Sequence, residues 1–262
     1  MGAMIEWLTD PANWVGSDGI WLRTLQHVQY SLVTLLIASI IAIPLGLWIG
    51  HTGKGRVLVV NLVNGMRSVP TLGLLFAAVL IVGPMIRGDL AFLAPSIFVL
   101  VVLAIPPVLA GAYSGVEEVD RAARDAAKGM GMTSRQVLRD VEIPCAMPLI
   151  FSGVRSAALQ VIATATVAAS VSIGGLGRFL IDGLAFRDYG MMAGGAVLVG
   201  VLALIIDFVF ALVQRLAVSP GLRPGTSRRR GRSSRGGNSA GSSSGASSTT
   251  SASPDIDVTT PA

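Results

Sequence analysis

Residues 120–148 read DRAARDAAKGMGMTSRQVLRDVEIPCAMP, a charged segment rich in small residues that lies between two long apolar runs. Acidic and basic residues sit four positions apart near its start, at Glu117 and Arg121, Asp120 and Arg124, and Arg121 and Asp125. Pairs with this spacing share one face of a helix and stabilise it by about 0.2–0.5 kcal/mol each. The spacing therefore predicts a surface helix over residues 116–128, the first of two short helices outside the membrane.

One side of this predicted helix carries small or flexible apolar side chains. At helical spacing they are Ala122, Ala123, Ala126, Ala127 and Met130. Such a face is nearly flat, so the backbone of another protein can approach it closely. Gly129 and Gly131 predict the end of the helix. Thr133 and Gln136 form a capping box that predicts a second helix, which is expected to stop before Pro144.

The spacing of this segment resembles a known motif. Asp125-Ala126-Ala127, three residues, Gly131, nine residues and Val141-Glu142-Ile143-Pro144 are similar to the EAA loop of permease subunits of bacterial ABC importers, with Asp125 in place of the usual Glu. The resemblance implies a coupling helix that docks in a groove of an ATPase subunit. The implied docking residues are Asp125, Ala126, Ala127, Gly131, Val141, Ile143 and Pro144. The charge pattern alone is equally typical of a solvent-facing loop helix without a partner.

The composition indicates an all-α integral membrane protein. Of 262 residues, 52% are hydrophobic and 13% are charged, too few charges to cover a soluble globule. The single Cys145 excludes an internal disulfide and offers no metal cluster. The chain contains no Gly-x-x-x-x-Gly-Lys-Ser/Thr motif, so we expect no ATP site, no enzymatic activity and no cofactor on this chain.

Five apolar segments predict five membrane spans, at about 28–50, 57–82, 91–112, 150–173 and 191–213. Lys54 and Arg56 follow the first span, and by the positive-inside rule they place that loop in the cytoplasm and the N-terminus outside. The bases of the loop at 113–148 agree with this orientation. The expected location is therefore a bacterial cell membrane, with the C-terminus in the cytoplasm.

The segments outside the predicted permease domain, 27–218, differ from it in composition. Residues 1–26 contain Trp7, Trp14 and Trp21, which favour the headgroup level of a membrane, although an unstructured terminus is the alternative. Residues 219–262 form a Ser-, Gly- and Arg-rich tail that is predicted to be disordered and cytoplasmic. Its basic start is expected to contact anionic lipid rather than nucleic acid.

Polar residues in three of the spans are candidates for a transport path or a gate. Asn61, Asn64, Arg67, Ser68 and Pro70 interrupt the second span, which predicts either a broken helix facing protein or water, or a helix that begins near Ser68. The small and hydroxyl residues of the fourth span favour a path-lining helix over a merely buried one. Asp207 in the fifth span is expected to pair with a base of the loop. The candidates are Arg67, Pro70, Ser156, Thr164, Thr166, Ser170 and Asp207.

Two further features of the spans carry local predictions. Pro95 and the pair Pro106-Pro107 predict a kink in the third span. The sequence Gly174-Gly175-Leu176-Gly177 predicts a tight turn after the fourth span rather than a phosphate-binding loop, because no Lys-Ser/Thr follows it. Residues 178–189 are then expected to form an external amphipathic or re-entrant segment.

A wider resemblance covers about residues 28–222 and points to the permeases of glycine betaine, carnitine and choline osmoprotectant importers. It rests on Arg67-Ser68-Val69-Pro70-Thr71-Leu72, Ile105-Pro106-Pro107, Val119-Asp120, Gly129-Met130-Gly131-Met132-Thr133, Gly153-Val154-Arg155-Ser156-Ala157 and Gly174-Gly175-Leu176-Gly177. Leu109-Ala110-Gly111 departs from the polar Arg-Asn-Thr that is usual there, so no substrate or gating role is assigned to that corner.

The resemblance implies an osmoprotectant permease with several partners: a dimer of ABC ATPase subunits that holds ATP and Mg²⁺, a substrate-binding protein, and a second permease copy or a paralogue. A permease for methionine or another amino acid is the alternative within this fold. An ATP-independent carrier or channel is the alternative of another class, and such proteins normally show inverted repeats across more spans.

Overall fold

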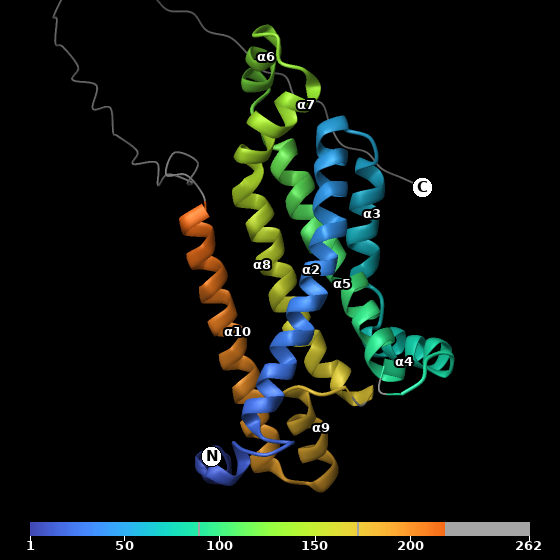
Figure 1. Cartoon of the computed structure of the whole chain (residues 1–262), viewed down its shortest axis with the longest axis vertical. Coiled ribbons are helices and arrows are strands. Elements are labelled where there is room, and N and C mark those ends of the chain that lie inside the picture. The colour runs from blue at the N-terminus through green and yellow to red at the C-terminus, as the bar shows by residue number, and fades with distance from the viewer. Residues whose placement is uncertain (89, 172, 218–262) are drawn as a thin grey trace, which may run out of the picture. The chain divides into compact units, whose positions relative to one another are not determined.

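A computed structural model describes residues 1–88, 90–171 and 173–217, without the side chains of Leu58, Val60, Asn64 and Arg67. Its elements are α1 (Gly2–Thr9), α2 (Ile20–Thr52), α3 (Arg56–Arg67), α4 (Thr71–Val82), α5 (Leu90–Glu117), α6 (Arg121–Gly129), α7 (Ser134–Val137), α8 (Ile143–Ala168), α9 (Gly177–Phe186) and α10 (Tyr189–Ala217), with short 3₁₀ turns and a π-helical stretch between some of them (Figure 1). No strand occurs within these ranges, which confirms the all-α prediction.

Four helical runs are long and apolar enough to cross a membrane: Ile20–Thr52, Leu90–Glu117, Ser134–Val171 and Tyr189–Leu216. With 33 residues, α2 is about 50 Å long at 1.5 Å per residue. That length exceeds the hydrocarbon core of about 30 Å. The helix therefore begins before the predicted span, at Ile20, and extends out of the bilayer.

Helix α5 makes the most extensive contacts in the bundle, with α2 and with α8, and these two helices also contact each other. Small residues make both contacts close. A Cβ added to Gly46 of α2 would meet the Cβ of Ala112 at 2.6 Å, and one added to Gly111 of α5 would meet the Cα of Gly153 at 2.7 Å. The backbones thus touch almost directly, a packing mode that membrane helices use.

The predicted span at 57–82 is not one helix in the structure. Helix α3 ends at Arg67, residues Ser68–Pro70 interrupt the chain, and α4 begins at Thr71. Each helix has 12 residues, about 18 Å, which is too short to cross the bilayer alone. Proline cannot donate a backbone hydrogen bond and disfavours helical geometry in the residue before it. The helix is therefore broken at the polar residues, as the first of the two predicted alternatives states. Helix lies on both sides of the break.

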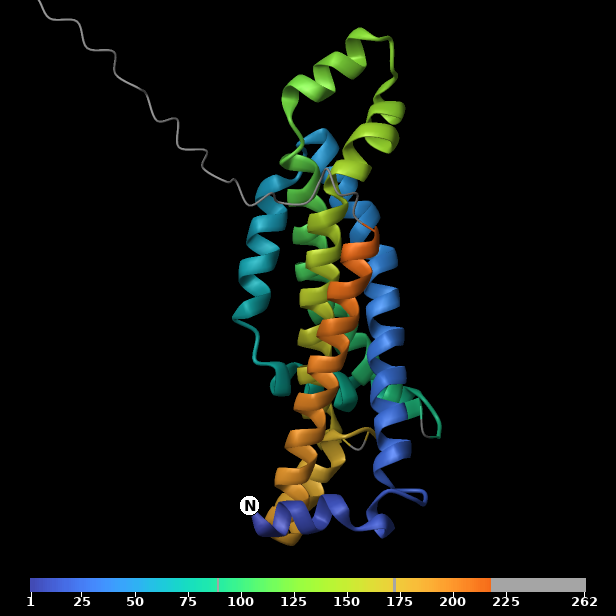
Figure 2. The same cartoon turned by 90° about the vertical axis from the view of Figure 1, so that its left-hand side faces the viewer.

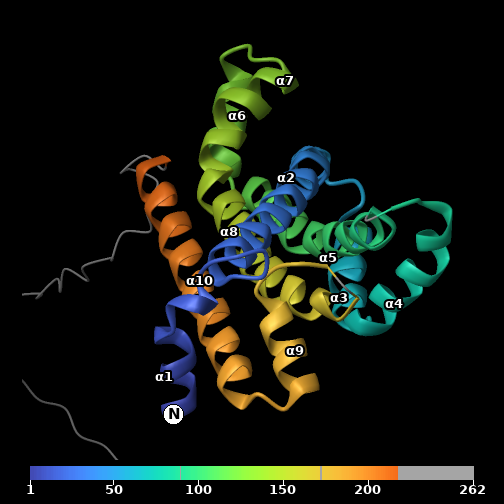
Figure 3. The same ribbon diagram turned by 60° about the horizontal axis from the view of Figure 1, so that its bottom comes forward.

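The N-terminal segment folds against the last long helix. Trp7 of α1 packs on Gly194 of α10, and its ring lies 5.1 Å from that of Phe179 in an edge-to-face arrangement. Figure 3 shows α1 lying beside the start of α10. The alternative of an unstructured terminus is therefore wrong for these residues, while residues 218–262, which include the whole predicted tail, lie outside the described residues.

The loop helices differ from their predicted limits in two places. Helix α5 continues to Glu117, and the first loop helix begins only at Arg121. The second does not stop before Pro144: α7 runs through a π-helical stretch, Leu138–Glu142, directly into α8. A wider π turn changes the hydrogen-bond register just ahead of the proline, so that Pro144 lies in the first turn of α8, where its missing N–H costs little.

Candidate functional site

The candidate docking segment stands at one end of the bundle. Helices α6 and α7 project beyond the ends of α2, α5 and α8, whereas α1 and α9 lie at the opposite end (Figures 1 and 2). We call these the α6–α7 end and the α1–α9 end. The prolines of the loop lie after α6, and its glycines lie at or after the last residue of α6. The helix is therefore uninterrupted.

Local hydrogen bonds fix the start and the end of α6. The backbone N–H of Ala122 donates to Oδ1 of Asp120 at 2.9 Å, which caps the first turn. At the other end Gly131 has φ +88°, a left-handed conformation that glycine adopts without steric cost. The N–H of Thr133 then donates to Oε1 of Gln136 at 2.7 Å. This bond confirms the predicted break and the predicted start of α7.

The small-residue face of α6 is mostly uncovered. Ala122, Ala123 and Ala126 are exposed, and Met130 is 77% exposed, whereas Ala127 is buried. Of the other candidate docking residues, Asp125 and Pro144 are exposed and Val141 and Ile143 are half-buried. A flat, uncharged strip on an otherwise charged helix is therefore open to a partner.

The charged residues of the loop make different pairs from those that the spacing predicted. Arg124 lies against Glu142, with Nε 3.0 Å from Oε1, and Glu117 pairs with Arg56 of α3 at 3.1 Å. Glu142 is only 2% exposed. Sequence reasoning missed it, although a single acid flanked by Val141, Ile143 and Pro144 is the signal that could have identified it.

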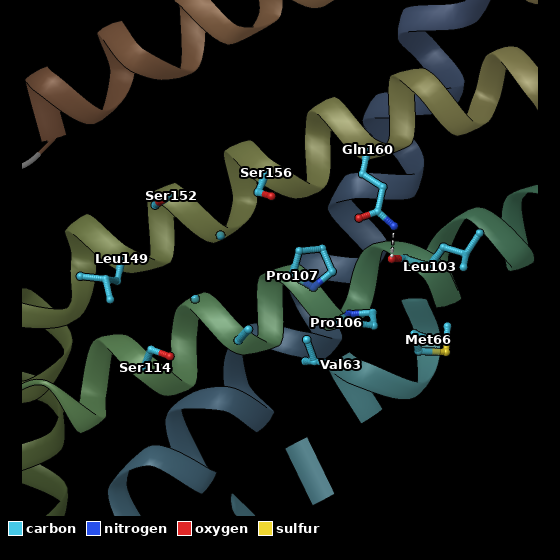
Figure 4. Close-up of a pocket in the computed structure, with 13 residues that line it drawn as sticks. Val63, Met66, Leu103, Pro106, Pro107, Ser114, Leu149, Ser152, Ser156 and Gln160 are labelled. Atoms are coloured by element: carbon cyan, nitrogen blue, oxygen red, sulfur yellow. Dashed lines mark hydrogen bonds between the residues drawn. The ribbon is translucent and has the colours of Figure 1, made fainter. Parts of the chain in front are cut away.

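A cavity of about 390 Å³ lies between α3, α5 and α8 (Figure 4). The described residues that line it are neutral: Val63, Met66, Leu103, Pro106, Pro107, Ala110, Gly111, Ser114, Leu149, Ser152, Gly153, Ser156 and Gln160. Ser152 and Ser156 are exposed, so the cavity is open to the surface beside α8. Hydroxyl and amide groups, with proline rings and glycine backbone, are what this cavity offers to a solute.

Of the predicted path residues whose side chains the structure describes, only one lines this cavity. Ser156 does, while the hydroxyls of Thr164 and Thr166 donate to carbonyls one turn back on their own helix. Ser170 is half-buried, and Pro70 is exposed at the start of α4. The side chain of Arg67 lies outside the described residues.

Gln160 has a second role at the cavity wall. Its Nε2 donates to the carbonyl of Leu103 at 3.0 Å (Figure 4). That carbonyl precedes Pro107 by four residues, so it has no intrahelical donor. A side chain of α8 thereby supplies the hydrogen bond that a proline removes from α5, and α5 continues as a helix through Pro95, Pro106 and Pro107.

Asp207 pairs with a different base from the predicted one. Nε and Nη2 of Arg155 donate to its two carboxylate oxygens, each at 2.6 Å. The partner therefore comes from the middle of α8 and not from the loop. A bidentate pair of this kind is a strong, geometrically specific contact, and it fastens α10 to α8.

The Gly174-Gly175 segment forms the predicted turn. Gly175 has φ +96°, and its N–H donates to Oε1 of Gln26 at 3.1 Å. The turn leads into α9, where Arg178 and Asp182 pair at 2.6 Å. Most of the segment at 178–189, which was expected to be amphipathic or re-entrant, therefore belongs to the helix α9.

Comparisons with known proteins agree with this architecture. Residues 42–220 match the family described as binding-protein-dependent transport system inner membrane component. The glycine betaine/carnitine/choline transport system permease protein of Bacillus subtilis (strain 168) is 34% identical over 77% of this chain and 89% of its own length. The choline transport system permease protein of the same organism is 32% identical over the same shares.

A solved structure shares the fold. The MetNI methionine ABC transporter in an inward-facing conformation contains a chain that superposes with a TM-score of 0.67 at 21% identity, covering 76% of this chain and 97% of that one. At this identity the likeness concerns the fold alone.

Proposed function

Because the chain belongs to the family of binding-protein-dependent transport system inner membrane components, we propose that it is the permease subunit of an ATP-driven importer for osmoprotectants. The relatives with 32–34% identity carry glycine betaine, carnitine and choline in their names. These solutes share a quaternary ammonium group, which is the class of substrate that we assign to this chain.

The exposed face of α6 is the observation that carries the coupling role. Ala122, Ala123 and Ala126 leave room for another backbone at the far end of the bundle, and Gly131 turns the chain back toward α8. We infer that this strip docks in the ATPase subunit, which binds ATP and Mg²⁺. The motif spacing and the position of α6 beyond the long helices support this assignment.

The orientation follows from the same assignment. The α6–α7 end lies in the cytoplasm, where the ATPase is, and the α1–α9 end faces outward, where a substrate-binding protein delivers the solute. Lys54, between α2 and α3, and Arg56, the first residue of α3, agree with this orientation by the positive-inside rule.

The cavity beside α8 is the proposed stretch of the path. It opens on the exposed side of Ser152 and Ser156, so a second permease copy, or a paralogue, closes it. The lining residues that the structure describes bear no charge, which suits a solute that must leave as readily as it enters. Selection of the quaternary amine then rests with the substrate-binding protein, the receptor of the importer.

Uptake measurements test the substrate class. In bacteria that lack their own osmoprotectant importers, the chain should support uptake of labelled glycine betaine, carnitine or choline when produced with its ATPase and receptor. An ATPase variant unable to hydrolyse ATP is the control and should abolish uptake. Uptake of methionine instead would establish the amino-acid alternative, and uptake without any ATPase would establish a carrier or channel.

Docking is tested at Ala126. Ala126→Glu places a long charged side chain on the flat face and should prevent co-purification of the ATPase, whereas Ala126→Ser keeps the face small and should behave like the wild type. Equal recovery of the ATPase with both variants would contradict docking on α6.

A further inference from the structure

A buried carboxylate links the loop to the bundle. Glu142 lies in the π-helical stretch before α8 and is 2% exposed. Its Oε1 is 3.0 Å from Nε of Arg124 on α6, and its Oε2 is 2.6 Å from Nδ1 of His51 near the end of α2. Both carboxylate oxygens therefore face a base, each from a different helix. The contact with Arg124 is an ion pair without a hydrogen bond, because Nε of Arg124 has no hydrogen-bond partner among the described residues.

The bonds continue from both bases. Nε2 of His51 lies 2.7 Å from Oγ of Ser134, the first residue of α7. A terminal nitrogen of Arg124 donates to the carbonyl of Val116 in the last turn of α5. Glu142 thus stands at the centre of a network, which we call the Glu142 cluster, formed by His51, Val116, Arg124, Ser134 and Glu142.

The chemistry of the cluster fixes its hydrogen atoms. An ionised carboxylate only accepts hydrogen bonds, so Nδ1 of His51 carries a proton. Its Nε2 faces Oγ of Ser134, and a serine hydroxyl can both donate and accept a hydrogen bond.

The cluster spans the two weak points of the loop. The chain is non-helical between α5 and α6, at residues 118–120, and again between α6 and α7, at 130–133. Without further contacts, a force on α6 would bend the chain at these two non-helical segments. The contacts of Glu142, His51 and Arg124 connect α2, α5, α6 and α7 directly, without passing through either segment.

We propose that Glu142 is a positioning residue for coupling, which fastens the docking helix α6 to the ends of α2 and α5 so that a displacement of α6 moves these helices. The proposal rests on the docking role of α6 proposed above. It gives a role to Glu142, which lies within the motif but is not one of the implied docking residues. It also gives a role to His51, which lies outside the motif.

Glu142→Gln is the first test. The amide has nearly the same shape, but its NH₂ group must face either Arg124 or His51, both donors, so one contact is lost. In the complex with ATPase and receptor reconstituted in vesicles, we expect normal co-purification and ATP hydrolysis. The solute transported per ATP hydrolysed should fall at least about fivefold, the lower end of typical coupling between sites.

Asp140→Asn is the matched control. Asp140 lies in the same π-helical stretch but is exposed, so the variant loses one carboxylate without disturbing the cluster and should keep the wild-type ratio. A Glu142→Gln ratio equal to that of the wild type would overturn the proposal. A wild-type complex that does not transport at all would instead refute the proposed function.

Variants of His51 separate coupling from folding. Asn keeps a donor near the place of Nδ1 and loses the contact to Ser134, whereas Ala loses both. The transport ratio should therefore decrease from the wild type to His51→Asn to His51→Ala, while assembly is retained. If Glu142→Gln alone fails to assemble, this series decides the matter. Failure of both Glu142→Gln and His51→Ala to assemble would overturn the proposal in favour of a purely structural role.

Discussion

At Pro107 the helix α5 lacks a backbone donor, and the side chain of Gln160 on α8 takes its place with a hydrogen bond of 3.0 Å to the Leu103 carbonyl. The contact lies at the wall of the α3–α5–α8 cavity. A helix that loses an internal hydrogen bond at a proline normally bends or opens there. Here a neighbouring helix holds the weak point, next to the proposed path.

Gln160→Leu should leave that carbonyl unpaired and lower the free energy of unfolding by about 1–3 kcal/mol. Thermal unfolding of the protein in detergent measures the loss. Pro107→Ala restores the backbone donor, so the double variant should recover most of it. Equal losses in the single and double variants would mean that Gln160 acts only by packing.

Gly131 controls the turn between α6 and α7 through its backbone. Its φ is +88° and nothing lies within 4 Å of an added Cβ, so only conformation opposes a side chain. Gly131→Val should cost about 1–3 kcal/mol locally and shift α6 relative to α7, lowering uptake while membrane insertion is unchanged. Gly129→Ala, also in open space but without a positive φ, is the control and should transport normally.

Residue-level predictions succeeded where chain geometry dictates one outcome. Gly131 and Gly175 adopt the left-handed backbone that their turns require. Partners of charged residues were harder, because they depend on helices that meet only in three dimensions. Asp207 pairs with Arg155, and Arg124 pairs with Glu142 rather than with its helical neighbour.

Among the elements, α10 is attached to the bundle by few polar contacts. The Arg155–Asp207 pair and the hydrogen bond from Gln214 to the Pro148 carbonyl join it to α8. Only 6% of an apolar 18-residue stretch of this helix is buried inside this chain. Lipid or a partner subunit must therefore cover most of this helix.

Asp207→Leu should leave Arg155 unpaired and destabilise the protein by about 2.5–3.5 kcal/mol, the cost of a charged residue at mid-membrane. The double variant Arg155→Met/Asp207→Leu removes both charges and should recover much of the stability. Gln214→Leu serves as a control without a charge and should cost about 1 kcal/mol. Denaturation of all four proteins in the same detergent gives the comparison. A double variant as unstable as Asp207→Leu would show that the contact is not an isolated pair.

Element predictions were accurate where apolar runs are long and uninterrupted. The helices α2, α5 and α10 cover their predicted spans and extend beyond them at both ends, whereas α8 begins before its predicted span of 150–173 and ends within it, at Ala168. The segment 57–82 was different, because its composition cannot tell whether Pro70 interrupts a helix or starts one. The continuity of α7 with α8 was also missed, since a π turn ahead of a proline has no simple sequence signal.

At the scale of the whole molecule, two parts of the chain were distinguished by composition alone. The described residues belong to one compact unit. The predicted start of the tail, at 219, lies outside the described residues and stays a prediction from composition, since large apolar residues give way there to Ser, Gly and Arg. Overall architecture was therefore predictable, while the packing partners of each helix were not.

Deletion of residues 226–262 tests whether transport needs the predicted tail. The proposed path and docking face lie outside this segment, so the truncated protein should take up solute at a rate close to that of the full chain. Uptake and membrane content, measured in the same cells, make the comparison. A truncated protein that inserts but does not transport would assign the tail an essential role.

The glycine contacts of α5 have a mechanical consequence. Where Gly46 meets Ala112 and Gly111 meets Gly153, one backbone rests almost directly on the next, so there is no layer of long side chains to yield under load. Glycine and alanine at these contacts let the three helices approach closely, so a long side chain at any of these positions would force the helices apart.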